Sequence, residues 1–70
     1  MTEVIPGKYR HFKGGEYEVL CTATHTETLE EEVVYRALYG EGRMWVRPLS
    51  MWLEEVEYNG KVVKRFEKIE

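Results

Sequence analysis

Apolar and polar residues alternate along most of this chain, in short segments separated by glycine, proline or runs of acidic residues. The clearest segment is Glu16–His25, in which every second residue from Tyr17 onward falls on one face: Tyr17, Val19, Cys21, Ala23 and His25. A period of two residues is typical of a half-buried β-strand. We therefore predict a strand here, with the small Cys21 and Ala23 side chains allowing another layer to approach closely.

The stretch Val33–Trp52 organises the rest of the chain. Its first part lies in a predicted strand, Glu32–Tyr39, which carries apolar residues on both faces and is therefore expected at the centre of a sheet. A glycine-containing turn leads to a second strand, Arg43–Arg47. Pro48 has no N–H to donate, so this strand ends there or lies at an edge. Residues 48–52 are predicted to form one turn of 3₁₀ helix, with the proline at its start.

Three more strands complete the prediction. Gly7–Phe12 is followed by a turn at residues 13–15, and the segments Glu54–Tyr58 and Lys61–Phe66 flank Asn59-Gly60, a strong signal for a two-residue hairpin. Short strands with turns every eight to twelve residues predict a mainly β fold. A small SH3-like, partly open antiparallel barrel with a short 3₁₀ turn fits best. An OB-like barrel is the alternative, although it normally needs a longer chain.

Length and composition indicate one small domain. The chain has 70 residues, of which residues 1–6 are expected to be a loose lead-in and residues 7–70 a single domain. A net charge of -3 argues against binding nucleic acid through overall charge, although a local basic patch remains compatible with it. One cysteine, an N-terminus without a signal-peptide pattern and the absence of a long apolar run predict a cytoplasmic protein without membrane attachment.

Two histidines are candidates for chemistry. His25 precedes Glu27 in a polar connection, and a histidine beside a carboxylate can transfer protons as a general acid or base. His25 is favoured instead as a structural residue that hydrogen-bonds the loop, and His11 as a structural or surface residue. The spacing of the histidines, Cys21 and the glutamates matches no zinc motif, so neither a metal nor a cofactor is predicted.

Nucleophilic catalysis would depend on Cys21 or Ser50. The alternation places Cys21 on an apolar face, where a thiol is normally unreactive, and Ser50 lacks the glycine-flanked turn of a nucleophile elbow. The glycine pairs precede no helix and no Lys-Ser/Thr sequence, so turn formation explains them. The sequence therefore favours a non-enzymatic protein.

Aromatic and arginine residues form the most informative candidate site: Tyr35, Arg36, Tyr39, Trp45 and Arg47. A guanidinium group beside aromatic rings can hold a base, a peptide or an anionic group by stacking and cation–π contact. His25, Glu27 and His11 are added as residues that would orient the ligand. The competing interpretation is that Trp45 and Trp52 form the core, because small domains depend on buried aromatics. Arg36, on a largely apolar face, is expected to need a carboxylate such as Glu27 or Glu54.

Several blocks together resemble the DUF1653 family: YRHFKG, ATHTET, VVYRALYG, MWVRPLSMW and the late RF. The resemblance extends from Gly7 to about Ile69. It implies a small, mostly β, bacterial domain with no established activity. It also marks the residues of the family pattern: Gly7, Tyr9, His11, Lys13, Gly14, Tyr17, His25, Glu27, Tyr35, Tyr39, Gly40, Trp45, Arg47, Pro48, Arg65 and Phe66. Trp52 stands where members more often have phenylalanine, which favours a packing role there.

Three functional hypotheses follow, in order of preference. The first is a binding module that recognises a peptide, a nucleotide or single-stranded nucleic acid in a cleft between the loop after His25 and the Trp45–Arg47 strand. The second is a protein–protein interaction or dimerisation domain, which would be a monomer or a weak homodimer when isolated. The third is a small hydrolase-type enzyme that acts on a nucleotide or polar metabolite through His25 and Glu27.

Overall fold

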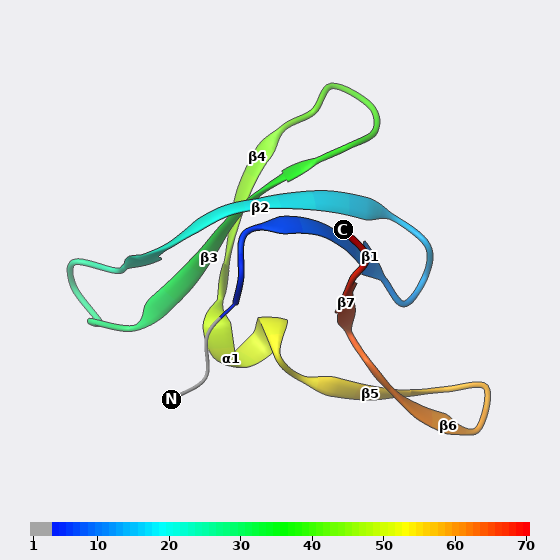
Figure 1. Ribbon diagram of the computed structural model, residues 1–70. Helices are drawn as coiled ribbons and strands as arrows, with labels where there is room; N and C mark the ends of the chain where they lie inside the picture. Colours follow the sequence, from blue (N-terminus) through cyan, green and yellow to red (C-terminus); the bar gives the residue numbers. More distant parts are fainter. Residues whose placement is uncertain (1–3) are drawn as a thin grey trace.

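The computed structural model describes residues 4–70, which form seven strands and one helical turn (Figure 1). In chain order these elements are β1 (Gly7–His11), β2 (Glu16–Thr24), β3 (Glu31–Ala37), β4 (Met44–Pro48), α1 (Leu49–Trp52), β5 (Glu55–Tyr58), β6 (Lys61–Lys64) and β7 (Phe66–Lys68). No helix within residues 4–70 is long and apolar enough to cross a membrane.

Five strands form one antiparallel sheet in the order β4-β3-β2-β1-β7, and β5 pairs with β6 as a separate hairpin. The sheet is curved but open, because β4 and β7 are its two edges and do not pair with each other (Figure 1). The prediction of a mainly β, antiparallel and partly open fold is confirmed. The predicted helical turn is also present, but its Leu53 N–H bonds the Leu49 carbonyl, which makes it α-helical and not 3₁₀.

The last predicted strand is divided into two. β6 ends at Lys64, and after Arg65 the chain joins the large sheet as β7, where Phe66 lies opposite His11. The chain turns a corner between the two strands at Arg65. The Arg65 N–H donates to the Glu54 carbonyl, and the Arg65 carbonyl accepts a hydrogen bond from the Phe12 N–H. The corner directs Phe66 into the core.

The predicted burial of Cys21 and Ala23 is wrong. A β-bulge between Val19 and Cys21 shifts the register, so that Val19 lies opposite buried Tyr35 whereas Cys21 lies opposite Val34. One extra residue in a strand exchanges the faces of all residues that follow it. Both small side chains therefore lie on the outer face of the sheet, and Cys21 is exposed.

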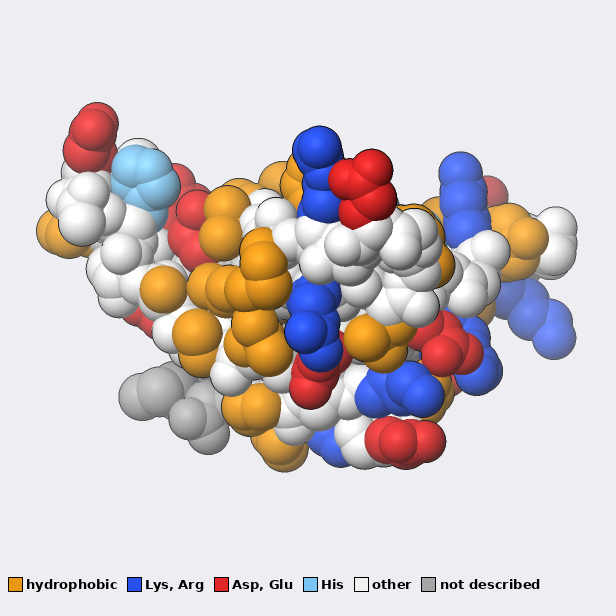
Figure 2. Space-filling model, turned by 90° about the horizontal axis from the view of Figure 1, so that it is seen from above, with side chains coloured by type: hydrophobic (Ala, Val, Ile, Leu, Met, Phe, Trp, Pro, Cys, Tyr) orange, Lys and Arg blue, Asp and Glu red, His pale blue; other side chains and the backbone are white. Residues whose placement is uncertain are grey.

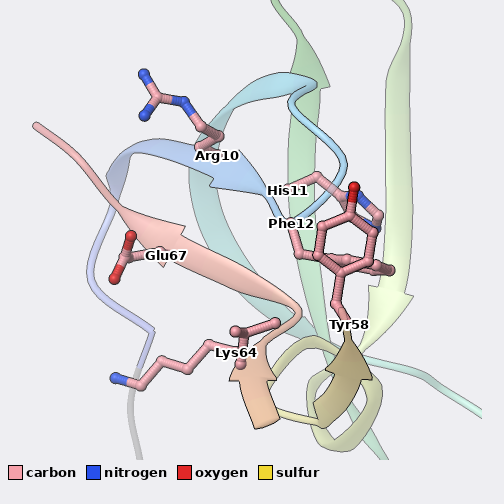
Figure 3. Close-up of a pocket in the computed structure, with 7 residues that line it drawn as sticks. Arg10, His11, Phe12, Tyr58, Lys64 and Glu67 are labelled. Carbon is pink, nitrogen blue, oxygen red and sulfur yellow. The ribbon is translucent and has the colours of Figure 1, made fainter. Parts of the chain in front are cut away.

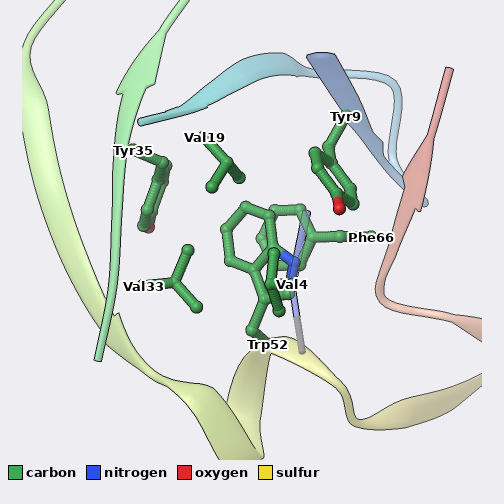
Figure 4. Close-up of a cluster of buried hydrophobic side chains, with 7 residues drawn as sticks. All are labelled: Val4, Tyr9, Val19, Val33, Tyr35, Trp52 and Phe66. Atoms are coloured by element: carbon green, nitrogen blue, oxygen red, sulfur yellow. The ribbon is translucent and has the colours of Figure 1, made fainter. Parts of the chain in front are cut away.

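The core lies between the inner face of the sheet, α1 and the N-terminal segment (Figure 4). Trp52 is 2% exposed and stacks on Phe66, with ring centroids 3.7 Å apart. Val4, inside the predicted lead-in, also belongs to this core, whereas residues 1–3 lie outside the described residues. The members of the cluster are Val4, Tyr9, Val19, Val33, Tyr35, Trp52 and Phe66. Trp52 is therefore a core residue.

Candidate functional site

Strand β4 and the residue that precedes it present three large side chains on the inner face, which we call the inner-face stripe: Arg43, Trp45 and Arg47. The register places Trp45 opposite Tyr35 and Arg47 opposite Val33, and both partners belong to the core. Residues directly opposite one another in an antiparallel pair share a face. Trp45 is nevertheless 50% exposed, because β4 is an edge strand and the core ends beneath it.

Arg47 is the charged residue of this stripe closest to the core. Its guanidinium carbon lies 5.4 Å from the centroid of the Phe66 ring, and its buried Nε has no hydrogen-bond partner in the part of the chain that the structure describes. The ion pairs formed within residues 4–70 use other cations: Lys8, Arg10, Arg36, Arg43 and Arg65. A half-buried arginine without a carboxylate is an attractive position for an anionic group of a ligand.

His11 lies beside Arg47 on the inner side of the fold. Its ring contacts Phe66 edge-on at 5.0 Å, and its Nδ1 accepts a hydrogen bond from the Lys13 N–H. Burial lowers the pKa of His11, and the positive charges of Arg65, Arg47 and Lys13 lower it further. Burial is the main cause of the low pKa, and the contributions of the three cations show that positive charge lies close to this ring.

Two tyrosines border the exposed end of the stripe. The hydroxyl groups of Tyr17 and Tyr39 are 2.7 Å apart and share a hydrogen bond. Burial raises the pKa of Tyr17 to about 12, and the hydrogen bond with Tyr39 raises it as well. Tyr39 and Trp45 line an open hollow of about 270 Å³, together with Ala37, Gly40, Glu41 and Arg43. The hollow therefore has aromatic walls and an arginine at its rim.

A second hollow, of about 250 Å³, lies between β1 and the β5–β6 hairpin. Figure 3 shows Tyr58 from β5 lying against Phe12, with His11 next to them and Arg10 directed away. The Phe12 and Tyr58 rings are 5.3 Å apart in an edge-on contact. This contact joins the hairpin to the sheet beside the backbone bonds of Arg65, so we interpret the second hollow as a packing seam.

Two of the predicted ligand-binding residues lie away from the stripe. Tyr35 is buried in the core, where its ring contacts Trp52 and Tyr17. Arg36 lies on the outer face of β3 and donates a hydrogen bond to Glu18, its cross-strand partner on β2. The prediction that Glu27 or Glu54 would pair with Arg36 is wrong.

His25 and Glu27 lie in the loop that joins β2 and β3, at the end of a projecting two-stranded ribbon (Figure 1). His25 Nδ1 accepts hydrogen bonds from the backbone N–H groups of Glu27 and Thr28, which stabilises the loop. Strand β3 begins at Glu31, four residues from Tyr35, the partner of Trp45, and two residues from Val33, the partner of Arg47. Neither His25 nor Glu27 lines any of the hollows described here, so a cleft between this loop and the Trp45–Arg47 strand stays a prediction.

The sequence-based set omitted two residues of the site, Arg43 and Tyr17. The spacing of two residues between Arg43, Trp45 and Arg47 was a usable signal, because such residues share a face of any strand. Tyr17 gave no comparable signal, since its partner Tyr39 is distant in sequence. Among residues 4–70, no three His, Cys, Asp or Glu side chains gather in a way that would hold a metal ion.

Comparison with known proteins identifies the family. Residues 7–68 match the model of DUF1653, described as a protein of unknown function. The fold is similar to the crystal structure of a DUF1653 protein from Bordetella bronchiseptica, with a TM-score of 0.88 and 38% sequence identity over 96% of this chain and 88% of the other. A comparison with curated proteins gave no match. The chain belongs to the DUF1653 family.

Proposed function

We propose that this domain is a binding module that holds an anionic ligand on the inner-face stripe and the neighbouring hollow. Arg47 would meet the anionic group, while Trp45 and Tyr39 would contact an apolar or planar part of the ligand. The observation that carries this proposal is the position of Arg47. It is half-buried, has no carboxylate partner among residues 4–70, and lies on the same strand face as a half-exposed tryptophan.

The surroundings of Arg47 support an anionic ligand over a cationic one. The positive charges of Lys13 and Arg65 act on the His11 ring together with that of Arg47, although the Arg65 guanidinium is also paired with Glu54. A guanidinium group next to an aromatic ring can bind a phosphate or carboxylate by paired hydrogen bonds while the ring stacks on the remainder of the ligand. The proposal thus keeps Tyr39, Trp45, Arg47 and His11 from the predicted set.

An NMR titration of ¹⁵N-labelled protein tests the proposal. Mononucleotides, short single-stranded oligonucleotides and acidic peptides would be added separately while the two indole N–H signals and the Arg47 amide are followed. We expect a bound ligand to shift the Trp45 indole signal but leave that of Trp52 nearly unchanged, because Trp52 is buried in the core. If no ligand class moves the Trp45 or Arg47 signals, the proposal is wrong.

Variants separate binding from folding. Trp45→Ala combined with Arg47→Ala should abolish binding in a domain that still folds, and Arg36→Ala on the outer face serves as the matched control. Trp52→Ala should instead cost about 3–5 kcal/mol of stability, as expected for a large buried aromatic. If the double variant unfolds, Trp45→Ala alone and Arg47→Lys would test the contacts with less disturbance of the core.

The proposal also includes the type of barrel and the cellular location of the domain. An SH3-like barrel would be consistent with the open curved sheet and its short connections. A cytoplasmic location would suit a domain whose single cysteine, Cys21, is exposed and unpaired. The acid–base pair of the enzyme hypothesis has little support, since His25 bonds the Glu27 backbone and neither residue lines any of the hollows described here.

A further inference from the structure

The backbone of β4 offers a second recognition element beside the inner-face stripe. β4 pairs with β3 on one side, and among residues 4–70 its other side has no partner strand. The Ala37 N–H donates a hydrogen bond to the Arg43 carbonyl. Every second residue from Arg43 onward is therefore hydrogen-bonded to β3. Arg43, Trp45 and Arg47 therefore direct their backbone groups toward β3, whereas Met44 and Val46 direct theirs toward the free edge.

This free edge is short and bounded at both ends. Pro48 lacks an N–H group, and the turn at residues 40–42 begins before Arg43. Only Met44 and Val46 can exchange two hydrogen bonds each with an added strand. Their side chains lie on the outer face and are 55% and 61% exposed. A strand of about five residues would fill this edge.

The outer face next to this edge is apolar. Val46 lies opposite Val34, and Met44 lies opposite Arg36, whose charge is paired with Glu18. Figure 2 shows hydrophobic side chains gathered beside basic and acidic groups on the face seen from above. An added strand would therefore meet apolar side chains on the outer face and the Arg-Trp-Arg stripe on the inner face.

Charge distinguishes between the possible occupants of the edge. In antiparallel self-pairing, the register in which Met44 and Val46 each exchange two hydrogen bonds with the same short segment of a second copy sets Met44 of one copy against Val46 of the other. That register also sets Arg43 opposite Arg47 of the second copy, and like charges directly opposite one another are destabilising. An acidic strand would place carboxylates at both positions, about 13 Å apart along the strand, and would supply Arg47 with the partner that it lacks.

We infer that the ligand of this domain is an extended acidic peptide segment that adds to the sheet as a strand antiparallel to β4. This inference rests on the proposed function, since it assigns a ligand class to the same stripe. The peptide would carry acidic residues opposite Arg43 and Arg47, a ring or apolar residue opposite Trp45, and apolar residues opposite Met44 and Val46. Backbone pairing would give affinity, and the alternating side chains would give selectivity.

A designed peptide tests this arrangement, the capped sequence Thr-Glu-Val-Tyr-Val-Glu-Thr. We expect it to bind and to slow amide hydrogen exchange at Met44 and Val46 by about tenfold or more, because these N–H groups become hydrogen-bonded. The amides of Trp45 and Arg47 already bond β3 and serve as internal controls. Replacing both glutamates of the peptide by lysine should abolish binding.

N-methylation of the peptide isolates the contribution of the backbone. Methylating the two valines, whose N–H groups would face β4, should weaken binding by about tenfold or more, whereas methylating the central tyrosine should have little effect. On the protein, Val46→Pro removes an edge donor without removing a bond to β3. It should abolish peptide binding, whereas Val46→Ala, which keeps the N–H and shortens only the apolar side chain, should weaken binding much less.

The outcomes distinguish this inference from the proposed function. If nucleotides or oligonucleotides shift the Trp45 and Arg47 signals and the acidic peptide does not, the peptide inference is wrong and the proposed function stands. Binding that is equally sensitive to methylation at all three positions would rule out strand addition. Protection of the Met44 and Val46 amides in the free protein, with a mass that rises with concentration, would identify a second copy as the occupant. Failure of every ligand class at the stripe overturns both proposals.

Discussion

Arg36 and Arg47 show how strand position decides the role of an arginine. Arg36 lies on the outer face next to Glu18, and their side chains are 47% and 40% exposed. An exposed pair of this kind adds about 0.2–1 kcal/mol to stability. Arg47 lies on the inner face against Phe66, where its charge has no such partner among residues 4–70. Arg36 therefore stabilises the sheet surface modestly, whereas Arg47 is the residue that we propose to meet a ligand.

His11 gives a pH-dependent prediction. Burial and three nearby cations lower its pKa below the ordinary value of 6.5, so the folded state binds this proton less tightly than the unfolded chain does. The neutral ring contributes its full stabilisation at pH values above the pKa that His11 has in the unfolded chain. This stabilisation is lost as the pH falls through the pKa that His11 has in the folded protein. We expect the free energy of unfolding to decrease from about pH 7.5 to about pH 5, and His11→Asn to reduce that decrease. Urea denaturation of both proteins at several pH values measures this change in the free energy of unfolding.

An NMR titration of the His11 ring provides the control. Arg47→Gln should raise the pKa of His11 toward its ordinary value, although burial, the largest cause of the shift, remains. Arg36→Gln removes a positive charge from the opposite face and should leave the His11 titration unchanged. A pKa of His11 at or above 6.5 in the unmodified protein would contradict this account.

Among the elements, the β5–β6 hairpin is the least firmly attached. Its two strands pair with each other and not with the five-stranded sheet, and its exposed turn has Asn59 and Gly60 at positive φ, as a type I′ turn requires. Contact with the sheet comes from Tyr58, whose ring lies against Phe12. A two-stranded hairpin is marginally stable by itself, so this contact controls how often the hairpin opens.

We predict that amides of the β5–β6 hairpin exchange with deuterium faster than those at the centre of the β2–β3 pair. Tyr58→Ala should accelerate hairpin exchange further, by about two- to tenfold, since an aromatic pair contributes about 0.5–1.5 kcal/mol. Val62→Ala, at a 67% exposed position of the same hairpin, should have little effect. Equal acceleration throughout the large sheet would show instead that the hairpin and the sheet unfold together.

For the whole molecule, the open sheet has one edge at which self-association would begin. Strand β7 has three residues, whereas β4 has five and exposes Met44, Trp45 and Val46. Natural proteins often protect edges with charges or proline. The opposition of Arg43 and Arg47 in a self-paired dimer, together with Pro48 at the strand end, provides such protection.

Reversing one charge should remove this protection. We predict that Arg43→Glu promotes dimerisation, because each copy would then place a carboxylate opposite Arg47 of the other. The lost Arg43–Glu41 pair is exposed at 3.7 Å and contributes little to stability. Sedimentation velocity over a range of concentrations measures the effect. Adding Val46→Pro to Arg43→Glu should return the protein to a monomer, and an unchanged monomer of the single variant would show that charge does not protect this edge.

Local sequence signals predicted most elements of the fold correctly. Alternation of polar and apolar residues, with the turn residues Gly40, Asn59 and Gly60, predicted the β3–β4 and β5–β6 hairpins, because hairpin formation depends on neighbouring residues. The same signals missed the bulge after Val19 and the separation of β7 from β6. Both features depend on pairing with strands that are distant in sequence, which a local pattern does not contain.

The sequence by itself determined a mainly β domain of the DUF1653 family and indicated a strand carrying Trp45 and Arg47. Only the tertiary structure decided that Trp52 packs in the core while Trp45 remains half-exposed, since exposure depends on which strand forms the edge of the sheet. Strand register likewise placed Arg36 and Arg47 on opposite faces of the sheet, and it put His25 and Glu27 in the loop between β2 and β3. The residue types of a site can be recognised locally, but their convergence is set by long-range pairing of the chain.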